Sequence, residues 1–220
     1  MDLQLIELLN IEPTKLDELL ALGWFRMQQT IFTTDVLSFN GLEYNAVWLR
    51  VNLINFKPDK KCKSLIFKNN EFKTEITRAT ITRQHEILYS QYKESIVFEG
   101  APSLQWLLFG NSRRNVFNTC AINVFDGHKM IATGFFDLGL NSAAGIVSIY
   151  DPLYKKHSLG KCIIWKKMLY CKHQNFKYFY PGYYVPGYPM FDYKLELGTS
   201  SLEYFETRKK EWFPIQRLNT

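Results

Sequence analysis

Three segments of different periodicity follow one another in AGIVSIYDPLYKKHSLGKCIIWKKMLYCKHQNFKYFY, residues 144–180. The first, AGIVSIYD (144–151), is a short apolar run. The second, SLGKCIIWKKMLYCKH (158–173), carries apolar residues at helical spacing, and the aromatic segment FKYFY (176–180) follows at once. The pattern therefore predicts a strand, a helix and a second strand.

A helical wheel of the predicted helix places Lys166, Lys167 and Tyr170 away from its apolar arc. That arc consists of Cys162, Ile164, Trp165, Met168, Leu169 and Cys171. We therefore expect the arc to be buried and the two lysines to point away from it.

Two further β segments precede this unit, VFNTCAINVF (116–125) and KMIATGFFDLGL (129–140), with Asp126-Gly127 between them as a turn signal. Upstream, residues 81–96 and 103–110 have apolar side chains at helical spacing. Three antiparallel strands followed by a strand–helix–strand crossover form the layout of GNAT acyltransferases. We therefore predict an α/β (α+β) fold of the GNAT type, with a mixed, mostly antiparallel sheet.

The N-terminal third has a β-rich pattern after a short helix. Thr14 is the expected cap of a helix over Lys15–Leu22, and Gly23 is its expected end. Residues 24–54 then read as strands, with a hairpin signal at Asn40-Gly41. We expect an N-terminal β-rich lobe over residues 1–78 and a GNAT-like transferase domain over residues 79–220.

Composition limits the classes of function. The chain has 220 residues, 46% of them hydrophobic, and a net charge of +6. This excess of basic residues suits an anionic partner such as RNA or a phosphorylated cofactor, and equally serves solubility. The four cysteines form no CxxC pair and the four histidines have no metal-ligand spacing, so we expect no metal. An acidic N-terminus and the lack of a long apolar run predict a cytoplasmic protein without membrane contact.

The loop before the predicted helix tests the GNAT reading more closely. GNAT proteins hold a pyrophosphate at a Gln/Arg-x-x-Gly-x-Gly/Ala loop, against the free N–H groups of a helix N-terminus. The equivalent residues here are His157-Ser158-Leu159-Gly160-Lys161-Cys162, which keep only the first glycine. The loop is therefore in the expected place but is poorly equipped for the diphosphate of coenzyme A.

A series of short motifs lies between residues 149 and 194. They are Tyr150-Asp151-Pro152, Tyr154, Ser158-Leu159-Gly160, Tyr180-Pro181-Gly182-Tyr183-Tyr184 and Met190–Lys194. Their order and spacing resemble the C-terminal half of the arginyl-tRNA–protein transferases and their bacterial leucyl-transferring relatives. Weaker agreement extends over about residues 19–197 and includes LLALGWFR and a central strand that ends in Asp137.

The resemblance implies transfer of an amino acid, arginine or leucine by analogy, from charged tRNA to the N-terminal α-amine of a protein. The partners would be aminoacyl-tRNA and the N-terminus of an acceptor protein or peptide, and no cofactor is expected. An aminoacyl ester is already activated, so the reaction needs orientation, a proton acceptor and stabilisation of the oxyanion. The absence of a nucleophile motif such as G-x-S-x-G is consistent with direct attack.

The same resemblance nominates site residues. Asp137 is the expected general base or binder of the donor's α-ammonium, with the capping of a nearby loop as the alternative. Tyr183 is the second catalytic candidate, as a phenolic donor to the oxyanion, and about half of the tyrosines in this segment are expected to be structural. The expected substrate-binding residues are Tyr150, Ser158, Leu159, Gly160, Tyr180, Gly182, Tyr184, Tyr188, Tyr193 and Lys194. The expected tRNA-binding residues, for which a solvated face is the alternative, are Lys60, Lys61, Lys63 and Lys68.

Some of these residues also have simpler explanations. Capping of the helix N-terminus is sufficient to explain Ser158, and Asp151 before Pro152 is better interpreted as a turn former.

Tyr183, Tyr184 and Tyr188 are expected either to stack on a terminal adenosine or to line the aminoacyl pocket.

Two departures from the family pattern leave other functions open. The family's early cysteine cluster is replaced by TTDVLSFNGLEYNAV (33–47), and its Arg-His pair corresponds to Glu94-Ser95. Altered acceptor specificity or lost activity would both follow from such changes. An N-acyltransferase that uses acyl-CoA, and a non-catalytic RNA- or peptide-binding relative, therefore remain alternatives.

Overall fold

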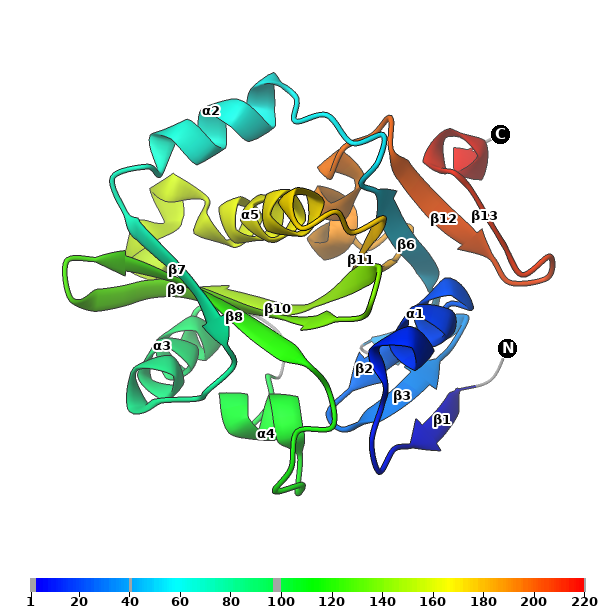
Figure 1. Ribbon diagram of the computed structural model, residues 1–220, viewed down its shortest axis with the longest axis horizontal. Coiled ribbons are helices and arrows are strands. Elements are labelled where there is room, and N and C mark those ends of the chain that lie inside the picture. Colours follow the sequence, from blue (N-terminus) through cyan, green and yellow to red (C-terminus); the bar gives the residue numbers. More distant parts are fainter. Residues whose placement is uncertain (1–2, 40, 97–99, 220) are drawn as a thin grey trace.

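An eight-stranded sheet forms the centre of the computed structural model, which describes residues 3–39, 41–96 and 100–219. Helices α5 and α2 cover one face of this sheet and α3 and α4 cover the other (Figure 1). In spatial order its strands are β13 (Glu211–Pro214), β12 (Leu202–Glu206), β6 (Val47–Asn52), β11 (Tyr178–Tyr184), β10 (Ser142–Tyr150), β9 (Lys129–Leu138), β8 (Thr119–Asp126) and β7 (Lys73–Arg78).

Two small sheets and eight helical segments complete the described fold. The small sheets are β1 (Gln4–Glu7), β3 (Thr30–Thr33) and β2 (Phe25–Met27), and β4 (Val36–Phe39) with β5 (Leu42–Asn45). The α-helices are α1 (Pro13–Ala21), α2 (Lys60–Lys68), α3 (Arg83–Glu94), α4 (Leu104–Phe109) and α5 (Leu159–His173). The 3₁₀ segments are η1 (Pro152–His157), η2 (Pro189–Glu196) and η3 (Ile215–Asn219).

The sheet is mixed and mostly antiparallel, as predicted. Among the strand pairs of the described residues, β10 and β11 alone run parallel, and α5 is the crossover between them. Strand β6 comes from the N-terminal third but lies between β12 and β11, so the sheet crosses the expected boundary at residue 78. The division into residues 1–78 and 79–220 stays a prediction.

Strands β10 and β11 pair over three residues and then separate. Their register runs from Ser142 opposite Tyr178 to Ala144 opposite Tyr180. Beyond this point β10 is irregular between Gly145 and Val147. β11 keeps its pairing with β6, from Tyr178 opposite Asn52 to Tyr184 opposite Val47. The separation leaves one edge of β10 without a neighbouring strand, in front of the start of α5.

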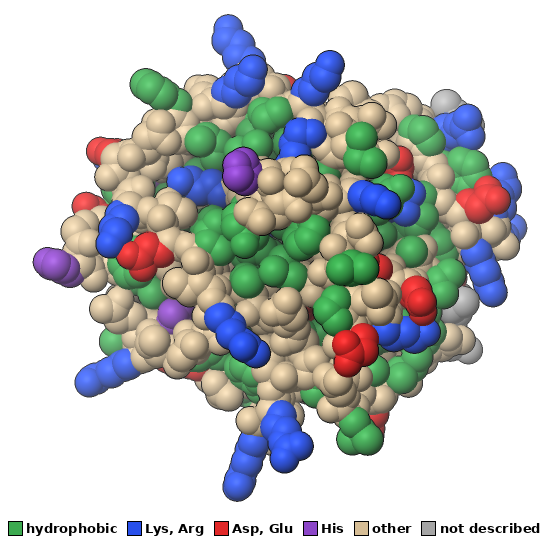
Figure 2. All heavy atoms as spheres, viewed as in Figure 1, with side chains coloured by type: hydrophobic (Ala, Val, Ile, Leu, Met, Phe, Trp, Pro, Cys, Tyr) green, Lys and Arg blue, Asp and Glu red, His purple; other side chains and the backbone are tan. Residues whose placement is uncertain are grey.

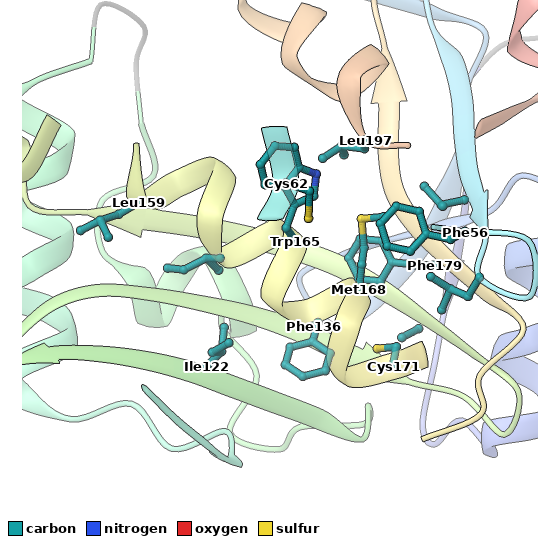
Figure 3. Packing of buried hydrophobic residues seen from close by; sticks show 14 of the residues in the cluster. Phe56, Cys62, Ile122, Phe136, Leu159, Trp165, Met168, Cys171, Phe179 and Leu197 are labelled. Atoms are coloured by element: carbon teal, nitrogen blue, oxygen red, sulfur yellow. The ribbon is translucent and has the colours of Figure 1, made fainter. Parts of the chain in front are cut away.

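The largest core cluster lies between the sheet and the helices α5 and α2. Trp165, Met168 and Cys171 of α5 lie over Phe136 of β9 and beside Phe179 of β11 (Figure 3). Removal of each such side chain from water contributes about 1.5–3 kcal/mol. This packing fixes α5, and with it the helix start that faces the gap between β10 and β11.

Lys167 is a correction to the helical wheel. Its side chain is buried, with 1% exposure, while the predicted core residue Ile164 is only half-buried and Ile163 is fully buried. A covering layer of α2 widens the buried arc of α5, and Gly134 of β9 provides the space for the lysine. A Cβ at Gly134 would lie 2.7 Å from Lys167 Nζ and 2.5 Å from Ile163 Cγ2.

Other local predictions differ in detail. Helix α1 begins at Pro13 with Glu12 as its N-cap residue, so Thr14 is not the cap, whereas the end at Gly23 (φ 77°) is confirmed. Asn40 of the predicted hairpin turn lies outside the described residues, and β4 and β5 pair on either side of it. Helix α2, for which no element was predicted, is capped by Asp59, whose carboxylate accepts a 2.7 Å bond from the N–H of Cys62.

Candidate functional site

A cavity of about 570 Å³ lies where β10 and β11 separate. Its walls come from Gly145–Ser148 of β10, Phe179 and Pro181 of β11, and the first two turns of α5. Segment η2 and Tyr92 of α3 close the remaining sides. The cavity is therefore bounded by the crossover unit and by the tyrosine-rich segment that follows it.

Aromatic rings form much of the cavity wall. The rings of Tyr92 and Tyr150 lie 5.6 Å apart between centroids, and Tyr193 and Phe179 add further apolar surface. Gly160 lets the Tyr150 ring lie against the first turn of α5, because a Cβ there would approach that ring to 3.3 Å. This surface suits an apolar or aromatic ligand group.

Ser158 occupies the N-cap position of α5, but its side chain makes no capping hydrogen bond. The residue has a left-handed backbone (φ 50°, ψ 43°), and its exposed side chain lines the cavity. The expected position is confirmed and the capping explanation of the hydroxyl is wrong. The first N–H groups of a helix have no partner within it, so this end suits an anionic or carbonyl oxygen.

Four lysines line the cavity in the described chain, two at least partly exposed and two buried. Lys155 is exposed, and Lys161 donates a 3.0 Å hydrogen bond to the carboxylate of Glu196. Lys194 is buried and donates a 2.6 Å hydrogen bond to the carbonyl of Tyr183. None of the residues that line the cavity in the described chain is acidic.

Burial lowers the pKa of Lys194 to about 7. Its Nζ lies 5.1 Å from the ring centroid of Tyr183 and 5.2 Å from that of Phe191. The resemblance placed Lys194 at the substrate, and the structure puts it on the cavity wall, held between two rings. Its role in substrate binding stays a prediction.

Lys167 is the functional candidate that the sequence reasoning missed. Its Nζ bonds to the carbonyl oxygens of Phe135 (3.0 Å) and Val147 (2.8 Å) and to the hydroxyl of Ser148 (3.1 Å). Burial lowers the pKa of Lys167 to about 7, against the opposing influence of Cys171 and Asp137. A wheel drawn by residue type had placed this lysine outside the core, and Gly134 is the only sequence signal we find for its space.

Asp137 does not line the cavity. Its buried carboxylate accepts hydrogen bonds from Arg26 (2.8 Å) and from the hydroxyl of Thr119 (2.6 Å). Burial raises the pKa of Asp137, and the Arg26 guanidinium and the Thr119 hydroxyl oppose that rise. The structure therefore gives Asp137 a structural ion pair with β2, and its catalytic role is an untested prediction.

The predicted substrate-binding residues separate into two groups. The cavity brings together Tyr150, Ser158, Gly160, Tyr193 and Lys194. The other predicted residues do not line the cavity: they are Leu159, Tyr180, Gly182, Tyr184 and Tyr188. The catalytic candidate Tyr183 does not line it either.

Several of these outlying residues pack against apolar neighbours. Leu159 belongs to the main core, and the ring of Tyr180 lies 5.5 Å from that of Trp212. Tyr183 packs on Trp48 at 5.4 Å and Tyr188 on Phe39 at 5.0 Å. In this structure these rings have packing partners, which is the structural alternative expected for part of the segment.

The predicted tRNA-binding lysines lie on α2. Lys60, Lys61, Lys63 and Lys68 are all exposed, and Figure 2 shows Lys and Arg side chains projecting from the edge of the molecule where α2 lies. Helix α2 packs on α5, and Lys68 donates a 2.5 Å hydrogen bond to the carbonyl of Lys156. The basic face of α2 thus lies beside η1, the segment that leads to Ser158 at the cavity wall. Contact of this face with tRNA stays a prediction.

The chain is similar to a known protein family. A model of the family described as "Arginine-tRNA-protein transferase, C terminus" matches residues 74–203. The chain belongs to this family. The match runs from β7 to the start of β12 and includes every described residue that lines the cavity.

Individual relatives carry two related names. An aspartate/glutamate leucyltransferase of Leptospira interrogans is 32% identical over 154 residues, which cover 66% of this chain and 58% of that protein. One of Shewanella sp. (strain MR-7) is 26% identical over 84% of this chain and 76% of that protein. Arginyl-tRNA--protein transferase 1 of Saccharomyces cerevisiae is 31% identical over 41% of this chain and 18% of that protein. The chain thus spans less than two thirds of the length of its Leptospira relative.

Among solved structures, FemX superposes with a TM-score of 0.52 at 9% identity, covering 83% of this chain and 64% of that one. At this identity the likeness concerns the fold alone, and it supports the GNAT-type architecture of the family member described here. Over its described residues the chain has no helix long and apolar enough to cross a membrane. The same residues contain no group of three or more His, Cys, Asp or Glu that would hold a metal ion.

Proposed function

We propose that this family member transfers an aminoacyl group from charged tRNA to the N-terminal α-amine of a protein. One observation supports this above the others: residues from several of the family motifs line a single cavity. Tyr150 comes before α5, Ser158 and Gly160 lie at its start, and Tyr193 and Lys194 follow it in the chain, and all five line the same space. The relatives named for leucyl and arginyl transfer support the same reaction.

The cavity provides what direct aminolysis of an ester requires. The α-amine attacks the ester carbonyl, and the tetrahedral intermediate then releases the 3′-terminal ribose oxygen of the tRNA. Beyond Ala144 this edge of β10 has no strand opposite it among the described residues, so those backbone N–H groups of residues 145–148 that face away from β9 are suited to hold the developing oxyanion. The helix start at Ser158 offers further N–H donors to a phosphate of the terminal nucleotide.

We further propose that the transferred group has an apolar side chain such as that of leucine. An arginine side chain buried in the cavity would meet Lys167 and Lys194 and no carboxylate among the lining residues that the structure describes. Burial of an unpaired guanidinium is costly, and like charges add to that cost. The aromatic and aliphatic wall formed by Tyr92, Ile164 and Phe179 suits a leucyl side chain instead.

For the acceptor we propose an acidic N-terminal residue. Lys155 is an exposed lysine on the cavity wall, where an aspartate or glutamate side chain next to the attacking amine would meet positive charge, and Lys161 could exchange its bond to Glu196 for that carboxylate. The names of the Leptospira and Shewanella relatives support this choice. The exposed lysines of α2 would contact the tRNA backbone.

A transfer assay with the full chain tests this proposal. tRNA charged with radiolabelled leucine or arginine is mixed with peptides that differ only in the N-terminal residue: Asp, Glu, Arg or Ala. We expect leucine to be transferred to the Asp and Glu peptides, and the same peptides with an acetylated N-terminus provide the matched control. No label in any peptide while charged tRNA stays intact would overturn the proposal, and labelling from acetyl-CoA would favour the acyl-CoA alternative.

A further inference from the structure

One wall of the cavity contains a buried amine whose position aminoacyl binding does not explain. Lys167 extends from α5 to the irregular part of β10, and its Nζ lies 3.1 Å from the hydroxyl of Ser148, which itself lines the cavity. The missing Cβ of Gly134 is what makes the approach possible. A lysine in such a place needs an explanation, because a buried charge costs free energy unless it is paired.

The three partners of Lys167 Nζ suit both of its protonation states. The carbonyl oxygens of Phe135 and Val147 accept only, and they satisfy two N–H bonds in either state. The Ser148 hydroxyl is the one partner that can reverse its role. It donates to the lone pair of a neutral amine and accepts the third N–H bond of an ammonium. A proton can therefore enter or leave this site with no movement other than rotation of one hydroxyl.

We propose that Ser148 and Lys167 form a proton relay, in which the Ser148 hydroxyl passes a proton from the attacking α-amine to the amine of Lys167. This inference rests on the proposed transfer reaction, because it supplies the proton acceptor that the reaction needs. Ser148 touches the reacting nitrogen, and Lys167 acts through it.

The steps of the relay balance. As the C–N bond forms, the nitrogen of the tetrahedral intermediate gives a proton to Ser148 Oγ, while the Ser148 hydroxyl proton moves to Lys167 Nζ. The ester C–O bond then breaks, and the proton returns through Ser148 to the departing ribose oxygen. Nothing is oxidised or reduced, and both side chains end as they began.

The surroundings of Lys167 keep the neutral amine accessible. Burial lowers its pKa to about 7, and the groups that oppose this are Cys171 on α5 and Asp137 on β9. Asp137 is already paired with Arg26 at 2.8 Å. No described carboxylate forms an ion pair with Lys167 that would hold it permanently protonated, and an acceptor that titrates near neutrality is the most effective one for such transfer.

The test compares pH–rate profiles of leucyl transfer by the full chain, from about pH 5.5 to 9. For wild type we expect kcat/KM to rise with pH along an acid limb set by two groups, Lys167 and the acceptor's α-amine, whose ordinary pKa is about 7.7–8.0. We expect Lys167→Met to lower kcat/KM about 10²- to 10⁴-fold and to leave an acid limb set by the α-amine alone. Ser148→Ala, which keeps the amine, should change the profile in the same direction.

Lys167→Arg tests whether Lys167 acts as a proton acceptor or only as a positive charge, and Lys166→Met is its control. Lys167→Arg retains a positive charge that does not deprotonate in proteins, so it should be as slow as Lys167→Met. Lys166→Met is the matched control, since Lys166 bonds to Thr74 on the far side of the helix and should keep the wild-type profile. Circular dichroism and thermal melts confirm that each variant is folded before rates are compared.

A titration of the lysine side chains by ¹³C NMR gives a readout independent of turnover. A signal with a midpoint near 7 that disappears in Lys167→Met supports the relay, and a midpoint above about 10, the ordinary lysine value, overturns it. Activity with an unchanged acid limb in Lys167→Met or Lys167→Arg also overturns it. Absence of transfer by wild type with every donor and acceptor would instead overturn the proposed function, and the relay with it.

Discussion

The guanidinium of Arg26 and the amine of Lys167 are both buried against β9, but their partners differ. Arg26 meets the carboxylate of Asp137, the hydroxyl of Thr119 and two backbone carbonyls. Lys167 meets two carbonyls and one hydroxyl, and no carboxylate is within ion-pair distance among the described residues. A guanidinium does not deprotonate in proteins, whereas a buried lysine amine without a carboxylate partner can exchange its proton. We therefore expect Arg26 to contribute to the stability of the fold and Lys167 to the proposed proton transfer.

The largest expected effect comes from breaking the paired site. Arg26→Met leaves Asp137 buried without its counter-ion, which should lower the free energy of unfolding by about 3–5 kcal/mol. Urea denaturation at neutral pH measures this. In the double variant Arg26→Met with Asp137→Leu, much of the loss should be recovered, because no unpaired charge remains. A loss below about 1 kcal/mol for Arg26→Met would contradict the structural role.

The space that holds Lys167 gives the next largest effect. Gly134→Ala places a Cβ within 2.7 Å of Nζ and 2.5 Å of Ile163 Cγ2, and such overpacking should cost about 1–3 kcal/mol. We expect transfer to slow as well, since the amine would be displaced from Ser148.

A double-mutant cycle sharpens that result. In the background of Lys167→Met, Gly134→Ala should still destabilise through Ile163 but should no longer reduce transfer. Equal fractional loss of activity in both backgrounds would show that Gly134 does not act through the lysine.

The stability of the protein should also depend on pH at the unpaired site. From about pH 7 to 8.5 the unfolded chain keeps its lysines protonated, whereas folded Lys167 loses its proton, so unfolding takes up protons and stability rises with pH. Lys167→Met should flatten this rise, leaving the part due to Lys194, and Lys166→Met should not. Denaturation midpoints across this range provide the measurement, and identical slopes in all three proteins would contradict the low pKa.

Above about pH 9 the sign reverses. Burial raises the pKa of three thiols to about 11 or 12, so they stay protonated in the folded protein while the unfolded chain loses those protons. They are Cys62, Cys162 and Cys171. A stability maximum between these two windows is the expected outcome.

The smallest expected effect concerns the cavity mouth. Gly160→Ala brings a Cβ to 3.3 Å from the Tyr150 ring, so the ring must shift by a few tenths of an ångström. We expect a rise in KM for charged tRNA with little change in kcat, and a change in stability below about 1 kcal/mol. A fall in kcat alone would show that Tyr150 acts on the reacting groups instead of on binding.

The sequence predicted the elements whose pattern is local. Strands β8 to β10 and helices α3 to α5 have clear apolar periodicity, and the structure confirms them. Helix α2 was missed because Cys62 is its one fully buried residue in the structure, which leaves little periodic signal. The mixed sheet followed from the order of these elements together with the resemblance.

The site was harder to predict, for two physical reasons. The pairing of Asp137 with Arg26 joins residues 111 positions apart, so no local pattern indicates it. The burial of Lys167 depends on the space that Gly134, which has no Cβ, leaves beside strand β9. Residue type alone does not reveal that this space receives a lysine. Tyr150, Tyr193 and Lys194 were predicted as substrate-binding residues and do line the cavity. The order of the family motifs, which can be read in the sequence without any geometry, was sufficient to select them.

The position of β6 affects the order in which the sheet is completed. This strand is synthesised early, yet both of its neighbours, β11 and β12, come from the last fifth of the chain. During translation its two edges, and the apolar side chains of Trp48, Leu49 and Val51, stay without these partner strands until residues 178–206 have been made. The central sheet therefore closes around β6 only after both of these later strands are available, and until then β6 is an unpaired strand of the kind that favours aggregation.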